Sequence, residues 1–135
     1  MRSFHTTILG SLVVLAIVLA ACGGPTNCPG LTTGAADQAK FGQHFTNMAL
    51  AKQGGAAQTS DPKFAASDNL EVVTTTLADT STRMCVQSGK PPVDKTSTLA
   101  KGESRTAVGT FGKGSHVVRV FVDGTLVKNL PFTVQ

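Results

Sequence analysis

The end of the chain most restricts the possible fold, because its pattern predicts a β-hairpin. Valines occupy alternate positions in 116–122, Asp123-Gly124 follows, and apolar residues alternate again in 126–134. Asp-Gly between two alternating runs is typical of a type I′ turn, whose two central residues need positive φ. Pro131 cannot donate a ladder hydrogen bond, so the last strand is expected to be an edge strand, or bulged, at that position.

Several upstream segments predict further strands. Residues 70–77 form a β-branched run without helical periodicity, 82–87 alternate polar and apolar residues, and 104–111 is another candidate that ends at a glycine-rich turn. Residues 88–95, which contain Gly89 and two prolines, are expected to form a loop. About six or seven short strands at intervals of roughly 8 to 12 residues are typical of a β-sandwich.

Residues 39–51 fit two different elements. Their apolar residues fall on one face of a helix that Asp37 would cap, whereas 45–51 equally fits a first strand. We expect the strand, because Gly42 weakens a helix and the chain downstream is β.

Two C-terminal segments carry a family likeness. Residues 114–124 read Gly-Ser-His-Val-Val-Arg-Val-Phe-Val-Asp-Gly and 130–134 read Leu-Pro-Phe-Thr-Val. With the strands before them, from residue 64 onward, they resemble the immunoglobulin-like β-sandwich modules of bacterial surface lipoproteins. The resemblance implies an all-β fold, a small antiparallel immunoglobulin-like sandwich, which we expect in 41–135.

The first 21 residues have the layout of a secretory signal peptide. Arg2 precedes the uncharged block 8–20, and no acidic residue comes before it. The block is shorter than the roughly 20 residues that a helix needs to cross about 30 Å of hydrocarbon. Cys-Gly-Gly-Pro follows and would end a helix. Export is therefore expected, without a transmembrane anchor.

The residues at the end of this block, Leu19-Ala20-Ala21-Cys22, resemble the lipobox of bacterial lipoproteins. The resemblance implies a diacylglyceryl group, with acyl chains such as palmitate, on the Cys22 thiol, cleavage between Ala21 and Cys22, and anchoring on the extracytoplasmic face of the plasma or outer membrane. The alternatives are an ordinary signal peptide with Cys22 as a bystander, or an uncleaved helix. Residues 22–40, rich in small and polar side chains, are then the lipidated N-terminus and a flexible tether.

Cys28 and Cys85 remain if Cys22 carries lipid. Export permits a disulfide between them, and closing the loop would be worth about 4 kcal/mol in the chain-entropy model. The alternative is two separate thiols, with Cys85 buried in a strand. Neither cysteine belongs to a CxxC pair, so no zinc site is expected.

Charge and aromatic content exclude some ligands. The formal net charge of +4 falls to +3 without Arg2, and the lysines and arginines are scattered singly, so nucleic acid is not an expected partner. Trp and Tyr, the usual platforms for sugars, are absent. Phe121 lies on the strand face opposite its valine neighbours and is the best candidate for an exposed aromatic contact.

Three short motifs resemble parts of active sites, and their context rejects them. Residues 60–63 and 67–69 match SxxK and SDN of penicillin-binding proteins, but a proline separates the serine from the lysine and the chain is too short for that fold. Residues 109–115 fail the P-loop spacing. His44 and His116 have no recognisable acid partner. We therefore expect no enzyme activity and no cofactor.

The leading hypothesis is a non-enzymatic, lipid-anchored module of the cell envelope that binds, adheres or assists. Its ligand would be an envelope protein or a cell-wall polymer, and the loops 88–95 and 109–115 are natural contact surfaces.

The alternative is a small copper chaperone or enzyme. It would use His44 and His116 together with Met48 and Met84, because imidazole and thioether ligands suit copper.

Overall fold

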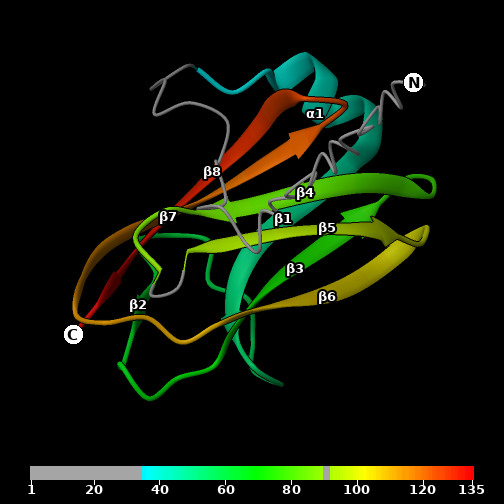
Figure 1. Cartoon of the computed structure of the whole chain (residues 1–135). Coiled ribbons are helices and arrows are strands. Elements are labelled where there is room, and N and C mark those ends of the chain that lie inside the picture. The colour runs from blue at the N-terminus through cyan, green and yellow to red at the C-terminus, as the bar shows by residue number, and fades with distance from the viewer. Residues whose placement is uncertain (1–34, 90–91) are drawn as a thin grey trace, which may run out of the picture.

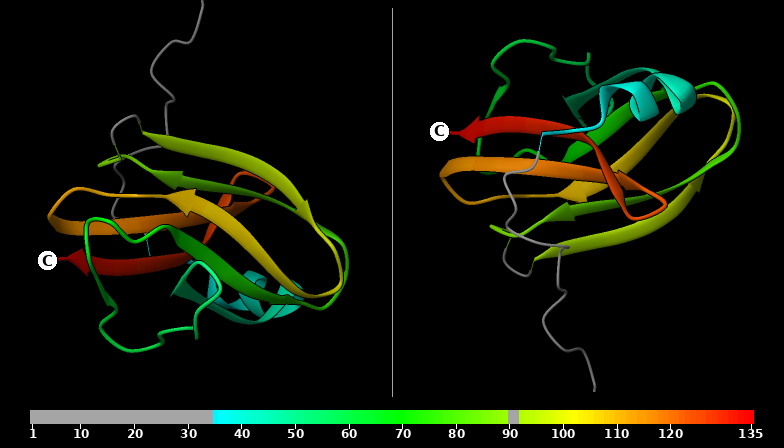
Figure 2. Two further views of the ribbon diagram at one scale, coloured as in Figure 1. Left: turned by 90° about the horizontal axis from the view of Figure 1, so that it is seen from below. Right: turned by 90° about the horizontal axis from the view of Figure 1, so that it is seen from above.

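The computed structural model describes residues 35–89 and 92–135, which form one short helix and eight strands (Figure 1). The elements are α1 (Gln38–His44), β1 (Phe45–Lys52), β2 (Lys63–Phe64), β3 (Leu70–Thr76), β4 (Thr80–Val86), β5 (Val93–Leu99), β6 (Gly102–Gly109), β7 (Gly114–Val122) and β8 (Thr125–Val134). The strands build two sheets that pack face to face as two layers (Figure 2). The expected all-β sandwich is confirmed.

The two sheets have different sizes. The smaller has the strand order β1-β3-β6 and the larger β2-β8-β7-β4-β5. All neighbours are antiparallel except β2 and β8, which run parallel through Lys63–Phe64 and Thr133–Val134. The chain changes sheet between β1 and β2, β2 and β3, β3 and β4, β5 and β6, and β6 and β7, whereas β4–β5 and β7–β8 are consecutive strands of one sheet. Such crossings between two packed sheets are typical of Greek-key sandwiches.

The core lies between the sheets and follows from the alternation of apolar residues. Val118, Val120 and Val122 of β7 are at most 2% exposed, and Val72 of β3 is fully buried opposite them in the other layer. Each buried valine contributes roughly 1.5 to 3 kcal/mol of transfer free energy. The hairpin pattern thus determines which face of β7 points inward.

The turn of this hairpin has the conformation that its sequence predicts. Asp123 and Gly124 have φ values of 49° and 73°, so both central residues lie in the left-handed region that a type I′ turn requires. The same end of the sandwich holds α1, and the residue that caps this helix contacts the start of β8: Asp37 N–H donates to Leu126 O at 2.9 Å.

Residues 39–51 contain both of the elements that their sequence allows. The helix α1 ends at His44 and β1 begins at Phe45. The Asp37 carboxylate accepts the Lys40 N–H at 2.8 Å, so the cap that the pattern suggested is present. The expected strand over 45–51 is confirmed as β1, and the helix that was its alternative also forms, over Gln38–His44, despite Gly42. The helix also begins inside the segment 22–40 that was expected to be a tether.

The prediction for Phe121 was wrong. Its side chain does lie on the face away from the main core, but it is 6% exposed, because it packs against Cys85 of β4 and Leu126 of β8 in a second apolar cluster. The alternation of residues along β7 predicted the correct face for Phe121. It could not show that the neighbouring strands β4 and β8 also place apolar side chains on that face.

Several sequence predictions lie outside the described residues. They are the signal peptide 1–21 with the cleavage site Ala21-Cys22, lipidation of Cys22, and the proposed partner Cys28 of Cys85. Within the described ranges, no helix has the length and apolar content needed to cross a membrane.

Candidate functional site

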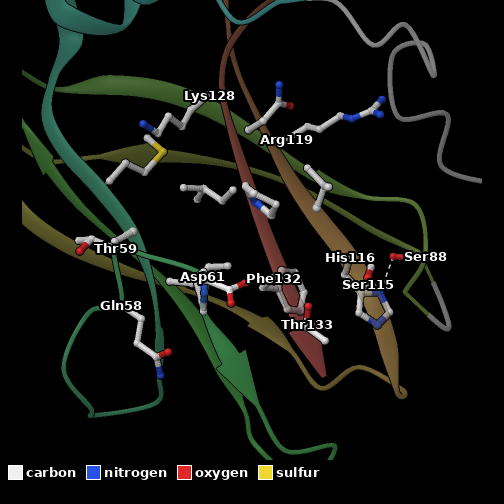
Figure 3. A pocket seen from close by; sticks show the side chains of 18 of the residues that line it. Gln58, Thr59, Asp61, Ser88, Ser115, His116, Arg119, Lys128, Phe132 and Thr133 are labelled. Carbon is white, nitrogen blue, oxygen red and sulfur yellow. Dashed lines mark hydrogen bonds between the residues drawn. The ribbon is translucent and has the colours of Figure 1, made fainter. Parts of the chain in front are cut away.

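A cleft of about 650 Å³ lies beside β8 (Figure 3). We refer to it as the β8 cleft. It is bounded by 128–133 of β8, 47–50 of β1 and residues of the 58–62 segment between β1 and β2, and it extends over 115–119 of β7. The cleft therefore lies where the edge of one sheet faces the edge of the other.

The open side of β8 explains why the cleft exists. β7 pairs with β8 throughout, whereas β2 joins its other side only at the end, where Thr133 N–H donates to Pro62 O at 3.0 Å. Backbone groups of an antiparallel strand alternate between its two sides. The N–H and C=O of Asn129 and the C=O of Pro131 therefore point the same way as Thr133 N–H. No strand of the described chain pairs with them, so Pro131 lies on an open edge, as predicted.

The opposite wall is β1, the edge strand of the smaller sheet. Gln58 N–H donates to Leu50 O at 2.7 Å, which ties the connection between β1 and β2 to this edge. Two residues earlier, the Met48 side chain is 5% exposed and lines the cleft. This wall is therefore apolar where the Met48 side chain lines it and polar where the segment 58–62 crosses it.

The cleft has an apolar floor and a polar rim. Four side chains that are at most 7% exposed form the floor: Met48, Leu50, Leu130 and Phe132. Thr59 and Asp61 are exposed on the rim. Lys128 and Arg119 lie toward one end of the cleft, and Gln58 and Asp61 toward the other (Figure 3).

Two polar side chains of β8 characterise the cationic end. Lys128 Nζ lies 5.1 Å from the centre of the Phe41 ring of α1, so a cation–π contact holds the ammonium group in place. Lys128 makes no ion pair within the described residues. The Oδ1 atom of Asn129 is buried and has no hydrogen-bond partner there, which is uncommon for a buried acceptor.

A histidine lies at the far end of the cleft. His116 is 8% exposed and stacks on Phe132, with ring centres 5.2 Å apart. Its Nε2 is 2.7 Å from Gly112 O and its Nδ1 is 2.6 Å from Ser88 Oγ. A carbonyl can only accept, so Nε2 carries the proton, and in the neutral ring Nδ1 accepts from the Ser88 hydroxyl.

This histidine brings together the two loops that were expected to form contacts. Ser88 follows β4, Gly112 precedes β7, and both border a second cavity of about 360 Å³. The partner of His116 was missed in the sequence, because no spacing relates Ser88 to it. The ring is oriented by a backbone carbonyl where a catalytic triad has a carboxylate. The arrangement joins two loops at the end of the sandwich.

The structure does not bring the proposed copper ligands together. His44 Nδ1 lies 3.5 Å from Thr80 Oγ1 at the start of β4, whereas His116 contacts Ser88 just after its end. A seven-residue strand separates them, which is roughly 20 Å. Met84 is fully buried in the core. The described part of the chain contains no group of three His, Cys, Asp or Glu side chains suited to a metal.

Cys85 lies on β4 opposite Asp94 of β5 and Arg119 of β7. Its side chain is 1% exposed within the Phe121 cluster. Cys28 lies outside the described residues, so the pairing of the two remains a prediction.

Two ion pairs hold the outer faces of the sheets. Arg83 donates two hydrogen bonds of 2.7 Å to the Asp94 carboxylate, and Arg105 donates to Glu71. The guanidinium in each pair lowers the pKa of its carboxyl below the usual value. These groups lie away from the β8 cleft, so we assign them to stability.

Sequence reasoning found the open position at Pro131 but not the cleft around it. The residues of segment 58–62 gave no signal, because their place on the rim depends on contacts with β1 and β8. Neither a protein-family model nor a curated protein matches the chain.

Proposed function

We propose that the chain is a lipid-anchored, extracytoplasmic binding module of the bacterial cell envelope and that the β8 cleft is its contact site. The main support for this contact site is the open edge of β8 at Asn129 and Pro131. This edge borders a cleft that has an apolar floor and a polar rim. Binding sites are typically concave and mostly apolar, with a few polar groups that orient the ligand.

The proposed anchor rests on the resemblance of Leu19-Ala20-Ala21-Cys22 to a lipobox. Two or three acyl chains on Cys22 would hold the module stably at a membrane. A non-enzymatic role agrees with the surroundings of His116, which is hydrogen-bonded between a serine and a backbone carbonyl.

Photo-cross-linking in intact cells tests both parts of the proposal. A photoreactive residue replaces Thr59 on the rim of the cleft in one variant, and exposed Thr98 of β5 in the control. Irradiation should give discrete cross-linked products from position 59 and none from 98. Cys22→Ala should abolish lipid labelling, release the protein from membranes and weaken the cross-links.

Equal products from both positions would reject the β8 cleft as the contact site. Unchanged membrane retention and lipid labelling of Cys22→Ala would reject the lipid anchor.

A further inference from the structure

The open edge of β8 offers a defined set of hydrogen-bonding groups. Asn129 presents a donor and an acceptor, and Pro131, two residues later, presents an acceptor. Two residues of a strand span about 6.8 Å, so the two carbonyl groups repeat at the spacing of a neighbouring peptide backbone. An extended polypeptide supplies N–H and C=O groups at the same interval, which sugars and acyl chains do not.

The existing sheet already shows the direction in which it can grow. β2 occupies the outer side of β8 at Thr133 and Val134 and ends there. The next positions along the same edge, at Pro131 and Asn129, border the cleft. A bound strand would therefore continue the row that β2 begins, and its inward side chains would meet Met48, Leu130 and Phe132 on the floor.

The charges at the edge indicate which peptide fits. Lys128 and Arg119 give one end of the cleft positive charge, and Lys128 has no carboxylate partner in the described ranges. At the other end, Asp61 is paired with Lys63 at 3.2 Å. A carboxylate of the bound peptide beside Lys128 would complete an ion pair there.

From these observations we infer that the β8 cleft binds an extended peptide segment of another protein by β-strand addition to β8, with an acidic residue of that peptide beside Lys128. Recognition by strand addition combines backbone hydrogen bonds for affinity with alternating side-chain pockets for specificity. The inference rests on the proposed function and names the partner class of the same site.

The test uses the full chain carrying Cys22→Ala, so that it is free of lipid, and two fluorescent octapeptides. Both alternate threonine and valine; one ends in two glutamates and the other in two lysines. Anisotropy measures their affinities, and amide chemical shifts locate binding. We expect the acidic peptide to bind more tightly and to shift the amides of Asn129 and Met48.

Lys128→Glu should weaken binding of the acidic peptide about tenfold and favour the basic one, because the charge reversal replaces attraction by repulsion. Lys101→Glu, the same charge change at an exposed lysine after β5, should change neither affinity. Asn129→Pro should abolish binding of both peptides. This substitution removes the N–H of residue 129, which does not take part in the hydrogen bonds between β7 and β8. Unchanged amide shifts in the β7–β8 hairpin would verify that the variant is folded.

Equal affinities of the two peptides, shifts confined to another surface, or no binding at millimolar concentration would overturn the inference. Concentration-dependent dimers that protect the Asn129 amide would do so as well, because a second copy would then occupy the edge. If the peptides fail while Thr59 still cross-links in cells, the proposed function stands and its ligand is not an extended peptide.

Discussion

Glu71 shows how a single residue stabilises the outer face of the smaller sheet. Its carboxylate accepts hydrogen bonds from Arg105 and from Gly54 N–H, the latter at 3.1 Å, although the residue is only 7% exposed. The Arg105 hydrogen bond is the main reason that its pKa lies below 4.5. The charged carboxyl therefore contributes stability that is complete above about pH 4.5 and is lost as the pH falls through the lowered pKa.

We predict that Glu71→Gln lowers the free energy of unfolding by about 1 kcal/mol at pH 7, because it removes a charge-assisted hydrogen bond. At pH 3 the difference from the unchanged protein should be smaller, because the unfolded chain then carries Glu71 largely protonated and the stability from the charged carboxyl, whose pKa is lowered in the fold, is partly lost. Urea unfolding at the two pH values measures this. Glu103→Gln serves as the control, because its side chain is 62% exposed and 3.5 Å from Arg105 Nε. An equal effect of both variants at pH 7 would contradict the assignment.

At the scale of elements, α1 depends on its cap and on its contact with β8. Asp37 accepts the Lys40 N–H, while Lys40 Nζ donates to Thr125 Oγ1 at 3.3 Å. The helix has only seven residues and buries none of them fully. An isolated helix of that length is unstable in water, so the cap and these contacts determine whether it forms.

Asp37→Ala should therefore cost about 1 kcal/mol and fray α1 before the sandwich unfolds. Amide exchange of Phe41 should become faster while that of Val118 in the core stays unchanged. Gln43→Ala, at an exposed position of the same helix, is the matched control and should leave both rates as they are. Faster exchange at Val118 as well would show that α1 and the sandwich unfold together.

The sequence predicted those elements whose local pattern of apolar and polar residues agrees with their burial in the fold. The hairpin 116–134 was recognised because alternation, turn residues and burial agree. β5 was assigned in part to the loop 88–95, because its polar, largely exposed residues carry no apolar alternation. β2 has two residues and exists only through its pairing with β8. The cleft and the pair of Ser88 with His116 depend on such long-range contacts, which no local pattern contains.

At the scale of the whole molecule, different elements and turns lie at the two ends of the sandwich. The end that carries α1 also carries the turn between β7 and β8, and the other end carries the end of β4, the start of β7 and the C-terminus (Figures 1 and 2). Cys85 lies near the second end, on the outer face of the larger sheet. A disulfide from Cys85 to a residue preceding α1 would connect the N-terminal segment to that face.

If Cys28 and Cys85 are paired, mass analysis after alkylation without reductant should find neither of them labelled. Cys28→Ser should then lower the free energy of unfolding by up to about 4 kcal/mol, and reductant should destabilise the unchanged protein by a similar amount. Two labelled thiols at positions 28 and 85, or no response to reductant, would contradict the pairing.

Pro131 also bears on solubility. A row of free backbone donors along β8 would let two molecules join edge to edge and continue into aggregates. Proline removes a donor from the middle of this row, yet it leaves the carbonyl groups available to a ligand. Pro131→Val should therefore increase light scattering as the protein is concentrated, whereas Pro92→Val, in the loop before β5, should not. If the two variants remain equally monomeric, other residues must protect this edge. The same proline would then have no part in keeping the molecules apart at high concentration.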